Sequence, residues 1–172
     1  MNTVVDLFEL NLTLTNPKLS YNHKLNAIVK TAAQHVPQAD MTSLWVCDES
    51  GSIHCIARFD KQSQQFSDGG VISNDNAAAY LEAILDRDIL AIESVREHPF
   101  TKDMNNEYFI PAGVYSLLDY ILHDDFKPKG VLCCEARSEV SQWQEHEKTV
   151  LKRIANSSSI FFDFSTYKQE CG

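Results

Sequence analysis

The feature that most constrains the fold is a pair of strand-like runs that leads directly into a long helix. Residues 115–122 (YSLLDYIL) and 130–137 (GVLCCEAR) are rich in apolar residues, and a short polar stretch separates them. This spacing predicts two antiparallel strands. Ser141 and Gln144, three positions apart, predict a capping box and a helix that continues past Phe161. Such a chain has to pack a helix against a sheet.

Helical periodicity predicts further helices upstream. A helix over residues 20–36 is expected to start at Ser20 and to stop at Pro37. Its apolar residues recur at helical spacing without a miss: Leu25, Ile28, Val29, Ala32, Ala33 and Val36. Residues 74–87 predict a second helix, with Asn74 or Asp75 as its cap. Residues 101–109 predict a third.

The remaining segments predict four more strands. A hairpin is indicated by residues 41–48 and 53–60, which flank a Glu-Ser-Gly-Ser turn. A third strand is predicted over residues 66–72, and a short strand over residues 88–93. The element order predicts an α+β domain with a central antiparallel sheet of six strands. We expect the N- and C-terminal helices on one face. The segment of residues 74–113 should cover the other face, and a cavity would form there.

A length of 172 residues fits one domain. Residues 1–16 are too apolar for a disordered tail and predict a short helix that packs on the domain or on a second subunit. We place the domain over residues 17–165, and residues 166–172 form a tail or the start of a connector to an output domain. Ser157–Ser159 precede several aromatic residues (Phe161, Phe162 and Phe164) that need burial, which indicates a dimer interface.

Composition excludes several classes of function. The net charge is −9, and the 15 Lys and Arg residues are scattered, so a nucleic-acid surface is not expected. No apolar run approaches the roughly 20 residues of a membrane span. Asp6 and Glu9 stand where a signal peptide would be basic. We therefore expect a cytoplasmic protein that binds neither nucleic acid nor membrane.

The cysteines indicate reduced thiols rather than a disulfide framework. The chain has five cysteines, an odd number, and none forms a C-x-x-C pair. The six histidines are isolated from one another, so a metal site is not expected. Cys133 and Cys134 are adjacent in a predicted strand and should face opposite sides of the sheet. Buried cysteine acting as a small apolar residue is the ordinary reading.

Five stretches in order along the chain carry a resemblance to a known family. They are residues 39–46 (ADMTSLWV), 93–101 (ESVREHPFT), 113–119 (GVYSLLD), 130–135 (GVLCCE) and 143–147 (WQEHE). From about Ser20 to Phe162 the chain resembles a GAF domain. The resemblance implies a six-stranded antiparallel sheet, a pocket opposite the terminal helices, parallel dimers through those helices, and a regulatory role.

The variant of the motif is similar to one type of bacterial sensor module. Ser-Leu-Leu-Asp at residues 116–119 and Trp-x-x-x-Glu at residues 143–147 resemble modules attached to diguanylate cyclases and histidine kinases. The sequence holds no Gly-Gly-Asp-Glu-Phe motif, P-loop or kinase motif. An output domain beyond Gly172, or a partner protein, would then carry the response.

The resemblance places six candidate ligand-binding residues around the pocket: Trp45, Tyr80, Met104, Tyr108, Tyr115 and Asp119. Each aromatic residue can equally be ordinary core. Asp119 is unusual because aspartate is depleted in strands. It can bond a ligand amine or ring N–H, or it can bond a neighbouring loop or helix and be purely structural. Glu135 is expected to pair with Arg137 or a lysine.

Three functions remain open at this stage. The first is a regulatory module that binds an unidentified small molecule and acts through the final helix, in a homodimer formed by the terminal helices. The second is a ligand-free dimerisation or interaction module whose pocket is filled by its own side chains. The third is an enzyme, but no triad, metal site or reactive dyad is visible, and the local sequences of cysteine-dependent reductases and bilin-binding domains are missing. The sequence does not name a cofactor.

Overall fold

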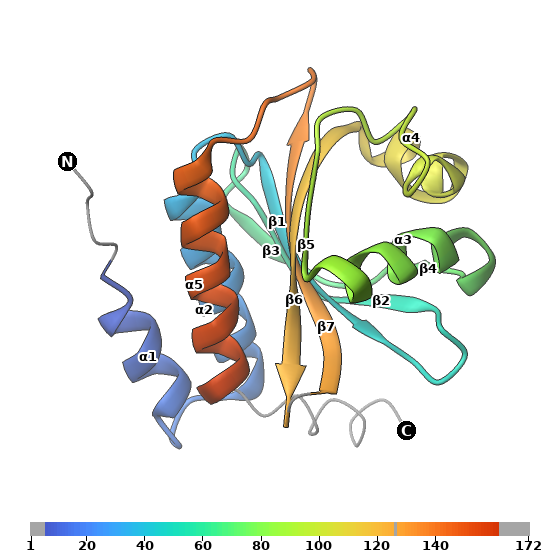
Figure 1. The fold of residues 1–172 in the computed structure, drawn as a ribbon. Coiled ribbons are helices and arrows are strands. Elements are labelled where there is room, and N and C mark those ends of the chain that lie inside the picture. Colours follow the sequence, from blue (N-terminus) through green and yellow to red (C-terminus); the bar gives the residue numbers. More distant parts are fainter. Residues whose placement is uncertain (1–5, 126, 162–172) are drawn as a thin grey trace.

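The computed structural model describes residues 6–125 and 127–161 and shows a sheet between two layers of helices (Figure 1). The elements are α1 (Phe8–Thr15), α2 (Tyr21–His35), β1 (Met41–Cys47), β2 (Ile53–Asp60), β3 (Gln65–Ser67), β4 (Val71–Ile72), α3 (Asn74–Arg87), β5 (Ile89–Ile92), the 3₁₀ helix η1 (Lys102–Met104), the π-helix η2 (Asn105–Phe109), α4 (Ile110–Ala112), β6 (Val114–Asp124), β7 (Lys127–Arg137) and α5 (Glu145–Phe161). The α+β class is confirmed.

The sheet is antiparallel throughout and runs in the order β3-β2-β1-β7-β6-β5. Five of the predicted strands are present as single strands. The predicted strand of residues 66–72 is instead divided into β3 and the two-residue β4, and both pair with β2. The strands β6 and β7 form the long central hairpin. Gly130 in β7 lies so close to β1 that an added Cβ would come within 2.3 Å of the Trp45 carbonyl oxygen.

The first and last helices cover one face of the sheet, as predicted (Figure 1). α2 and α5 lie on the strands, and α1 packs against both helices. Each buries the expected apolar stripe, including Leu25, Ile28 and Val29 in α2 and Leu151 and Ile154 in α5. Full burial of one such aliphatic side chain contributes about 1.5–3 kcal/mol. This stripe therefore fixes how the helices sit on the sheet.

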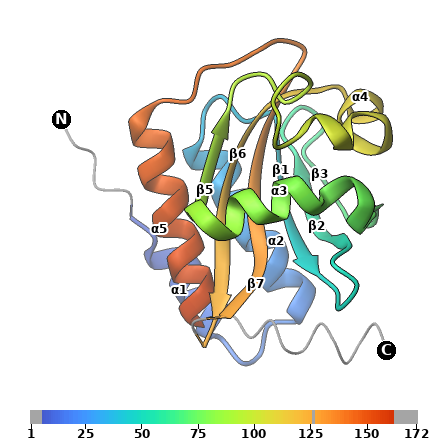
Figure 2. The same cartoon turned by 45° about the vertical axis from the view of Figure 1, so that its right-hand side comes forward.

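The other face carries α3 and the run η1–η2–α4, which we call the cover (Figure 2). A regular helix was predicted over residues 101–109, and that prediction is wrong in detail. The segment begins as a 3₁₀ turn and continues as a π-helix, in which the Ile110 N–H donates to the Asn105 carbonyl. Pro111 has no N–H, so it cannot donate the α-helical bond to the carbonyl of Glu107.

Two of the three predicted helix caps are wrong. Ser20 caps α2 by accepting the His23 N–H at 3.2 Å, as expected. In α5 the capping box joins Gln144 and Glu147, because the Gln144 N–H donates to the Glu147 carboxylate at 3.0 Å. Ser141 instead donates its N–H to Ser116 Oγ, outside the helix.

The start of α3 is capped from another element. Neither Asn74 nor Asp75 is the cap residue, because both lie inside the helix. The Glu107 carboxylate of η2 accepts the Ser73 N–H at 3.1 Å and the Asn76 Nδ2–H at 2.6 Å. A negative side chain at a helix N-terminus is favourable for the helix dipole. Glu107 therefore ties the two halves of the cover together.

α1 confirms the expected short N-terminal helix and packs on the domain itself. Its residues Leu10 and Leu14 are buried, whereas Phe8 and Leu12 are exposed. Phe162, Phe164 and the predicted tail of residues 166–172 lie outside the described residues. α5 continues through Ser157–Ser159 without a break. No helix in the described parts of the chain has both the length and the apolar content that crossing a membrane requires.

Candidate functional site

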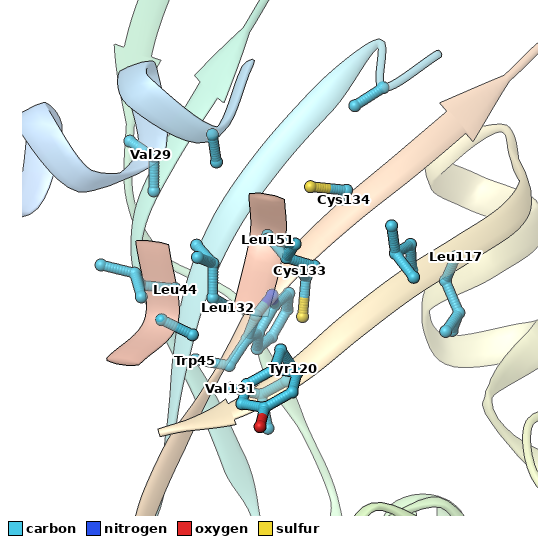
Figure 3. Close-up of a cluster of buried hydrophobic side chains, with 14 of the residues drawn as sticks. Val29, Leu44, Trp45, Leu117, Tyr120, Val131, Leu132, Cys133, Cys134 and Leu151 are labelled. Atoms are coloured by element: carbon cyan, nitrogen blue, oxygen red, sulfur yellow. The ribbon is translucent and has the colours of Figure 1, made fainter. Parts of the chain in front are cut away.

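The site is built on the face of the sheet that the cover packs against, which we call the pocket face. Asp119 in β6 lies directly opposite Cys133 in β7, and Leu117 lies opposite Glu135. Because side chains alternate along a strand, these four point to the same side. Cys134 belongs to the opposite side, and the two cysteine side chains leave β7 in different directions (Figure 3). Asp119 and Glu135 are thus diagonal neighbours on one face.

Each of the two acids is bonded to a tyrosine from a different part of the cover. The Tyr80 phenol of α3 donates to Asp119 Oδ2 at 2.5 Å. The Tyr108 phenol of η2 donates to both Glu135 oxygens at 2.9 Å. Asp119 and Glu135 are each only 3% exposed. Two tyrosine–carboxyl bonds therefore join the cover to the sheet.

Burial changes the chemistry of both acids. It raises the pKa of Asp119 to about 7, although the Tyr80 phenol and the Cys133 thiol act in the opposite direction. It raises the pKa of Glu135 to about 8, helped by the charge of Asp119 and opposed by the Tyr108 hydrogen bond and by Arg58. Both groups therefore hold a proton at neutral pH for much of the time. Asp119 Oδ1 is buried and has no hydrogen-bond partner.

The space between the cover and the pocket face is small. The cavity measures about 20 Å³ and is lined by Trp45, Ile53, Tyr80, Met104, Tyr108, Phe109, Leu117, Asp119, Cys133 and Glu135. A single water molecule needs about 10–15 Å³, whereas ligand pockets usually measure about 300–1,000 Å³. The protein's own side chains fill the remainder of the pocket, so a larger molecule enters only when the cover moves.

Aromatic rings fill the space between the cover and the pocket face. The Trp45 and Tyr108 rings meet edge to face with centroids 5.2 Å apart, and Phe109 lies 5.4 Å from Tyr108. The indole N–H of Trp45 donates to Ser43 Oγ at 2.8 Å, which fixes the indole on the sheet. Tyr108 and Phe109 are carried by the π-helix, an element that is often found at functional sites.

Five of the six candidate residues come together at this cavity, and Tyr115 does not. The pairing of β6 with β7 skips Tyr115, because the register shifts between Val114 and Ser116. A bulge of this kind turns the extra side chain away from its neighbours. The Tyr115 ring lies 3.9 Å from the Arg96 guanidinium and borders an open groove of about 500 Å³.

Sequence reasoning missed Glu135 as part of the site. It was expected to pair with Arg137 or a lysine, but Arg137 pairs with Asp60 and Glu135 accepts from Tyr108. The signal was the register of the hairpin, since pairing Asp119 with Cys133 puts Glu135 on the same face. Phe109 carried no comparable signal, because its position depends on the π-helix.

The described cysteines do not have the chemistry of activated nucleophiles. Burial raises the pKa of Cys55 to about 11 and also raises the pKa of Cys133 and Cys134. A reactive thiol needs the opposite shift, because the thiolate is the nucleophile. Among residues 6–125 and 127–161, no group of three or more histidine, cysteine or acidic side chains is placed to hold a metal ion.

Solved structures of several signalling domains share this fold. The blue-light-absorbing form of the Thermosynechococcus elongatus PixJ GAF domain is 19% identical, with a TM-score of 0.69 over 86% of this chain and 88% of that chain. The GAF domain of an Acinetobacter phosphoenolpyruvate-protein phosphotransferase is 16% identical, with a TM-score of 0.66 over 90% and 89%. The chromophore-binding domain of Stigmatella aurantiaca phytochrome P1 is 14% identical, with a TM-score of 0.68 over 95% and 63%.

At such low identity these structures are evidence of a common fold alone. No curated protein sequence matches the chain. The model of the GAF domain family, however, matches residues 23–160, which is most of the sequence and includes the whole of the site. The sheet, the flanking terminal helices and the covered pocket face agree with that match. This chain therefore belongs to the GAF domain family.

Proposed function

We propose that this chain is a regulatory module that senses a small molecule in a bacterial signalling protein. The ligand binds between the pocket face and the cover, and the bound state passes through the terminal helices to an output domain or a partner. One observation carries the proposal: two separate elements of the cover are held to the sheet by buried tyrosine–carboxyl bonds. The chain itself catalyses no reaction in this proposal.

The energies involved suit a switch. An intramolecular hydrogen bond contributes only about 0.5–1.5 kcal/mol net, because water competes for the same groups in the unfolded chain. A ligand that bonds to Asp119 and Glu135 in place of Tyr80 and Tyr108 therefore replaces the two hydrogen bonds that the cover loses. It shifts the population toward the state in which the cover has moved.

The sheet offers a direct route to the last helix. The strands β6 and β7 carry the acids on one face, and α5 packs on the other side of β6. Near the end of this strand the His123 N–H donates to Ser159 Oγ of α5 at 3.1 Å. At the opposite end of α5, Glu147 accepts the Gln38 N–H at 3.1 Å. A change in β6 can therefore reach the C-terminal end of α5 directly, whereas the segment before β1 holds the N-terminal end.

The wider setting of the proposal follows from the family. We propose a cytoplasmic homodimer formed through the terminal helices, linked to a diguanylate cyclase or histidine kinase output domain or acting on a separate partner. Two of the matched structures are light-sensing or chromophore-binding domains, and a third comes from a phosphotransferase. This range supports signalling as the common theme and leaves the ligand to be identified.

A second function is favoured by one observation. The protein's own side chains fill the pocket and leave a cavity of only about 20 Å³, as a ligand-free dimerisation or interaction module would require. In that case the cover is a permanent layer of the core. The two functions differ in one respect, namely whether a small molecule can replace the tyrosines on the acids.

Native mass spectrometry and tryptophan fluorescence test the proposal together. The chain has two tryptophans, so Trp143→Phe leaves Trp45, beside Tyr108, as the only emitter. We expect a heat-cleared metabolite extract from bacterial cells to add a small-molecule mass and to change Trp45 emission and hydrogen exchange in α5. An extract that adds no mass and leaves emission and exchange unchanged would favour the ligand-free function.

A further inference from the structure

Two carboxyl groups from the sheet line the cavity. The carboxyl groups of Asp119 and Glu135 supply four oxygens, and Asp119 Oδ1 has no partner although its residue is only 3% exposed. The two phenols that donate to these acids belong to the cover, which has to move before a ligand can enter. A buried acceptor without a donor is costly, so this face is complementary to a molecule rich in N–H or O–H groups.

We infer that the pocket selects a compact, flat organic cation, such as an amidine or a guanidine, whose N–H groups replace the two phenols on Asp119 and Glu135. This inference rests on the proposed ligand-sensing function and names the chemical class of its ligand. An amidinium or guanidinium group is planar and matches a carboxylate with two parallel N–H donors. Two acids on diagonal positions of adjacent strands can hold one such group between them or at its two ends.

The walls of the cavity favour a flat cation as well. Trp45 is fixed on the sheet by its bond to Ser43, and the ring that now lies against its side belongs to the cover residue Tyr108. When Tyr108 leaves, the Trp45 indole is exposed to the incoming molecule. A planar cation near an indole gains a cation–π contribution that a neutral or anionic molecule lacks.

An anion would meet the opposite environment. The residues that line the cavity include two acids and no basic side chain. Arg58 acts on Glu135 from outside the lining. Its guanidinium stands 6.0 Å from the Trp45 ring and donates to the Gly69 carbonyl, and its Nε is buried with no partner among the described residues. An anion in this space would therefore be opposed by either acid once that acid is ionised.

Binding of a cation should be linked to proton release. Both acids hold protons near neutral pH, so a cation that pairs with their carboxylates displaces those protons. Affinity then rises with pH, by up to about tenfold per pH unit for each proton released, until the acids are ionised in the free protein. The ionisable groups that act on the two acids are Tyr80 from α3, Tyr108 from η2, Arg58 from β2, and Cys133 and Arg137 from β7.

Three probes of one size and shape test the class of ligand. Benzamidine is a cation with N–H donors on its planar group, benzamide is its neutral counterpart, and benzoate is its anion. We expect benzamidine alone to bind by titration calorimetry and to change Trp45 emission in the Trp143→Phe background. Its affinity should rise between about pH 6 and about pH 8.

Two conservative variants connect the binding to the acids. Asp119→Asn and Glu135→Gln keep the shape of the protonated acid and remain able to accept from the tyrosines, so both should fold. Each should lower benzamidine affinity by at least about tenfold and flatten its pH dependence. Glu82→Gln on the exposed side of α3 removes the same charge away from the cavity and should leave affinity unchanged.

The outcomes separate this inference from the function on which it rests. If benzamide or benzoate binds at least as well as benzamidine and changes Trp45 emission, the pocket senses ligands and the cationic class is wrong. If none of the three binds, the class is also wrong, and the metabolite-extract experiment decides the function separately. Benzamidine binding that both acid variants leave unchanged would place the cation elsewhere and overturn the inference.

Discussion

At the scale of single residues, Asp119 and Glu135 are two buried acids on the pocket face. A carboxyl group in the core is tolerated in its protonated, hydrogen-bonded form, and its ionised form is disfavoured by burial. Asp119 and Glu135 each have a tyrosine partner, but Asp119 keeps one oxygen without a partner. A domain selected for stability alone would place apolar residues there. The pair therefore marks the site more clearly than any aromatic residue does.

The pKa shifts predict how stability depends on pH. Folding raises the pKa of Asp119 from 3.8 to about 7 and the pKa of Glu135 from 4.5 to about 8. Between these limits the folded chain therefore holds more protons than the unfolded chain. Stability falls as pH rises across that window, by up to about 1.4 kcal/mol per pH unit for each acid. Urea unfolding from about pH 5 to about pH 8 should show this loss, and Asp119→Asn should remove part of it. A wild-type curve as flat as that of the variant would contradict the shifts.

At the scale of elements, the cover is held together by a side chain rather than by a regular helix pair. Glu107 from η2 accepts from the Ser73 N–H, the Ser73 hydroxyl and the Asn76 amide at the start of α3. The Ser73 side chain itself makes no cap bond to the helix. This single carboxylate therefore does for α3 what a local cap residue does in other helices, and it also sets how η2 lies against α3.

Removing that carboxylate should loosen the cover. Glu107→Ala leaves the Ser73 N–H and the Asn76 amide without their protein acceptor, while Ser52 Oγ still accepts the Asn74 N–H. A lost helix cap typically costs about 0.5–2 kcal/mol. We expect a lower unfolding free energy and faster hydrogen exchange in both α3 and η2. Asp103→Ala, an exposed acid in the neighbouring η1, is the matched control. Equal exchange in the two variants would show that Glu107 does not link the elements.

The elements differ in how far the sequence predicts them. The stripe of α2 and the strands β6 and β7 were readable from local sequence, because α2 repeats its apolar residues at helical spacing and each of the two strands contains a long apolar run. The π-helix and the Glu107 cap were not readable, because they depend on Pro111 and on a partner 34 residues away from Ser73. The resemblance placed Tyr115 at the pocket, but this residue lies away from the cavity, where a bulge breaks the alternation of β6.

At the scale of the whole molecule, the two faces of the sheet have separate tasks. The helix side buries the apolar stripes of α2 and α5, and the pocket side contains the two acids. The irregular cover lies over the pocket side (Figures 1 and 2). The central strands belong to both layers through the alternation of their side chains. The sequence predicted this division and singled out Asp119 as a candidate site residue. The pairing of the acids with Tyr80 and Tyr108 depends on contacts between distant parts of the chain, which no local pattern contains.

The outer surface of the helix side predicts self-association. Phe8 is 63% exposed and Leu12 55% exposed on α1, and Ile160 is 75% exposed near the end of α5. Burial of such side chains contributes about 1.5–3 kcal/mol each, so a second copy packed on these helices would be stabilised. We expect a dimer by light scattering and dissociation to monomers in the double variant Phe8→Glu, Leu12→Glu. Leu85→Glu changes a similarly exposed residue on α3, at 52%, and should remain dimeric. A wild-type chain that stays monomeric at every concentration would exclude the dimer and leave the helices to act on a linked domain or a different protein.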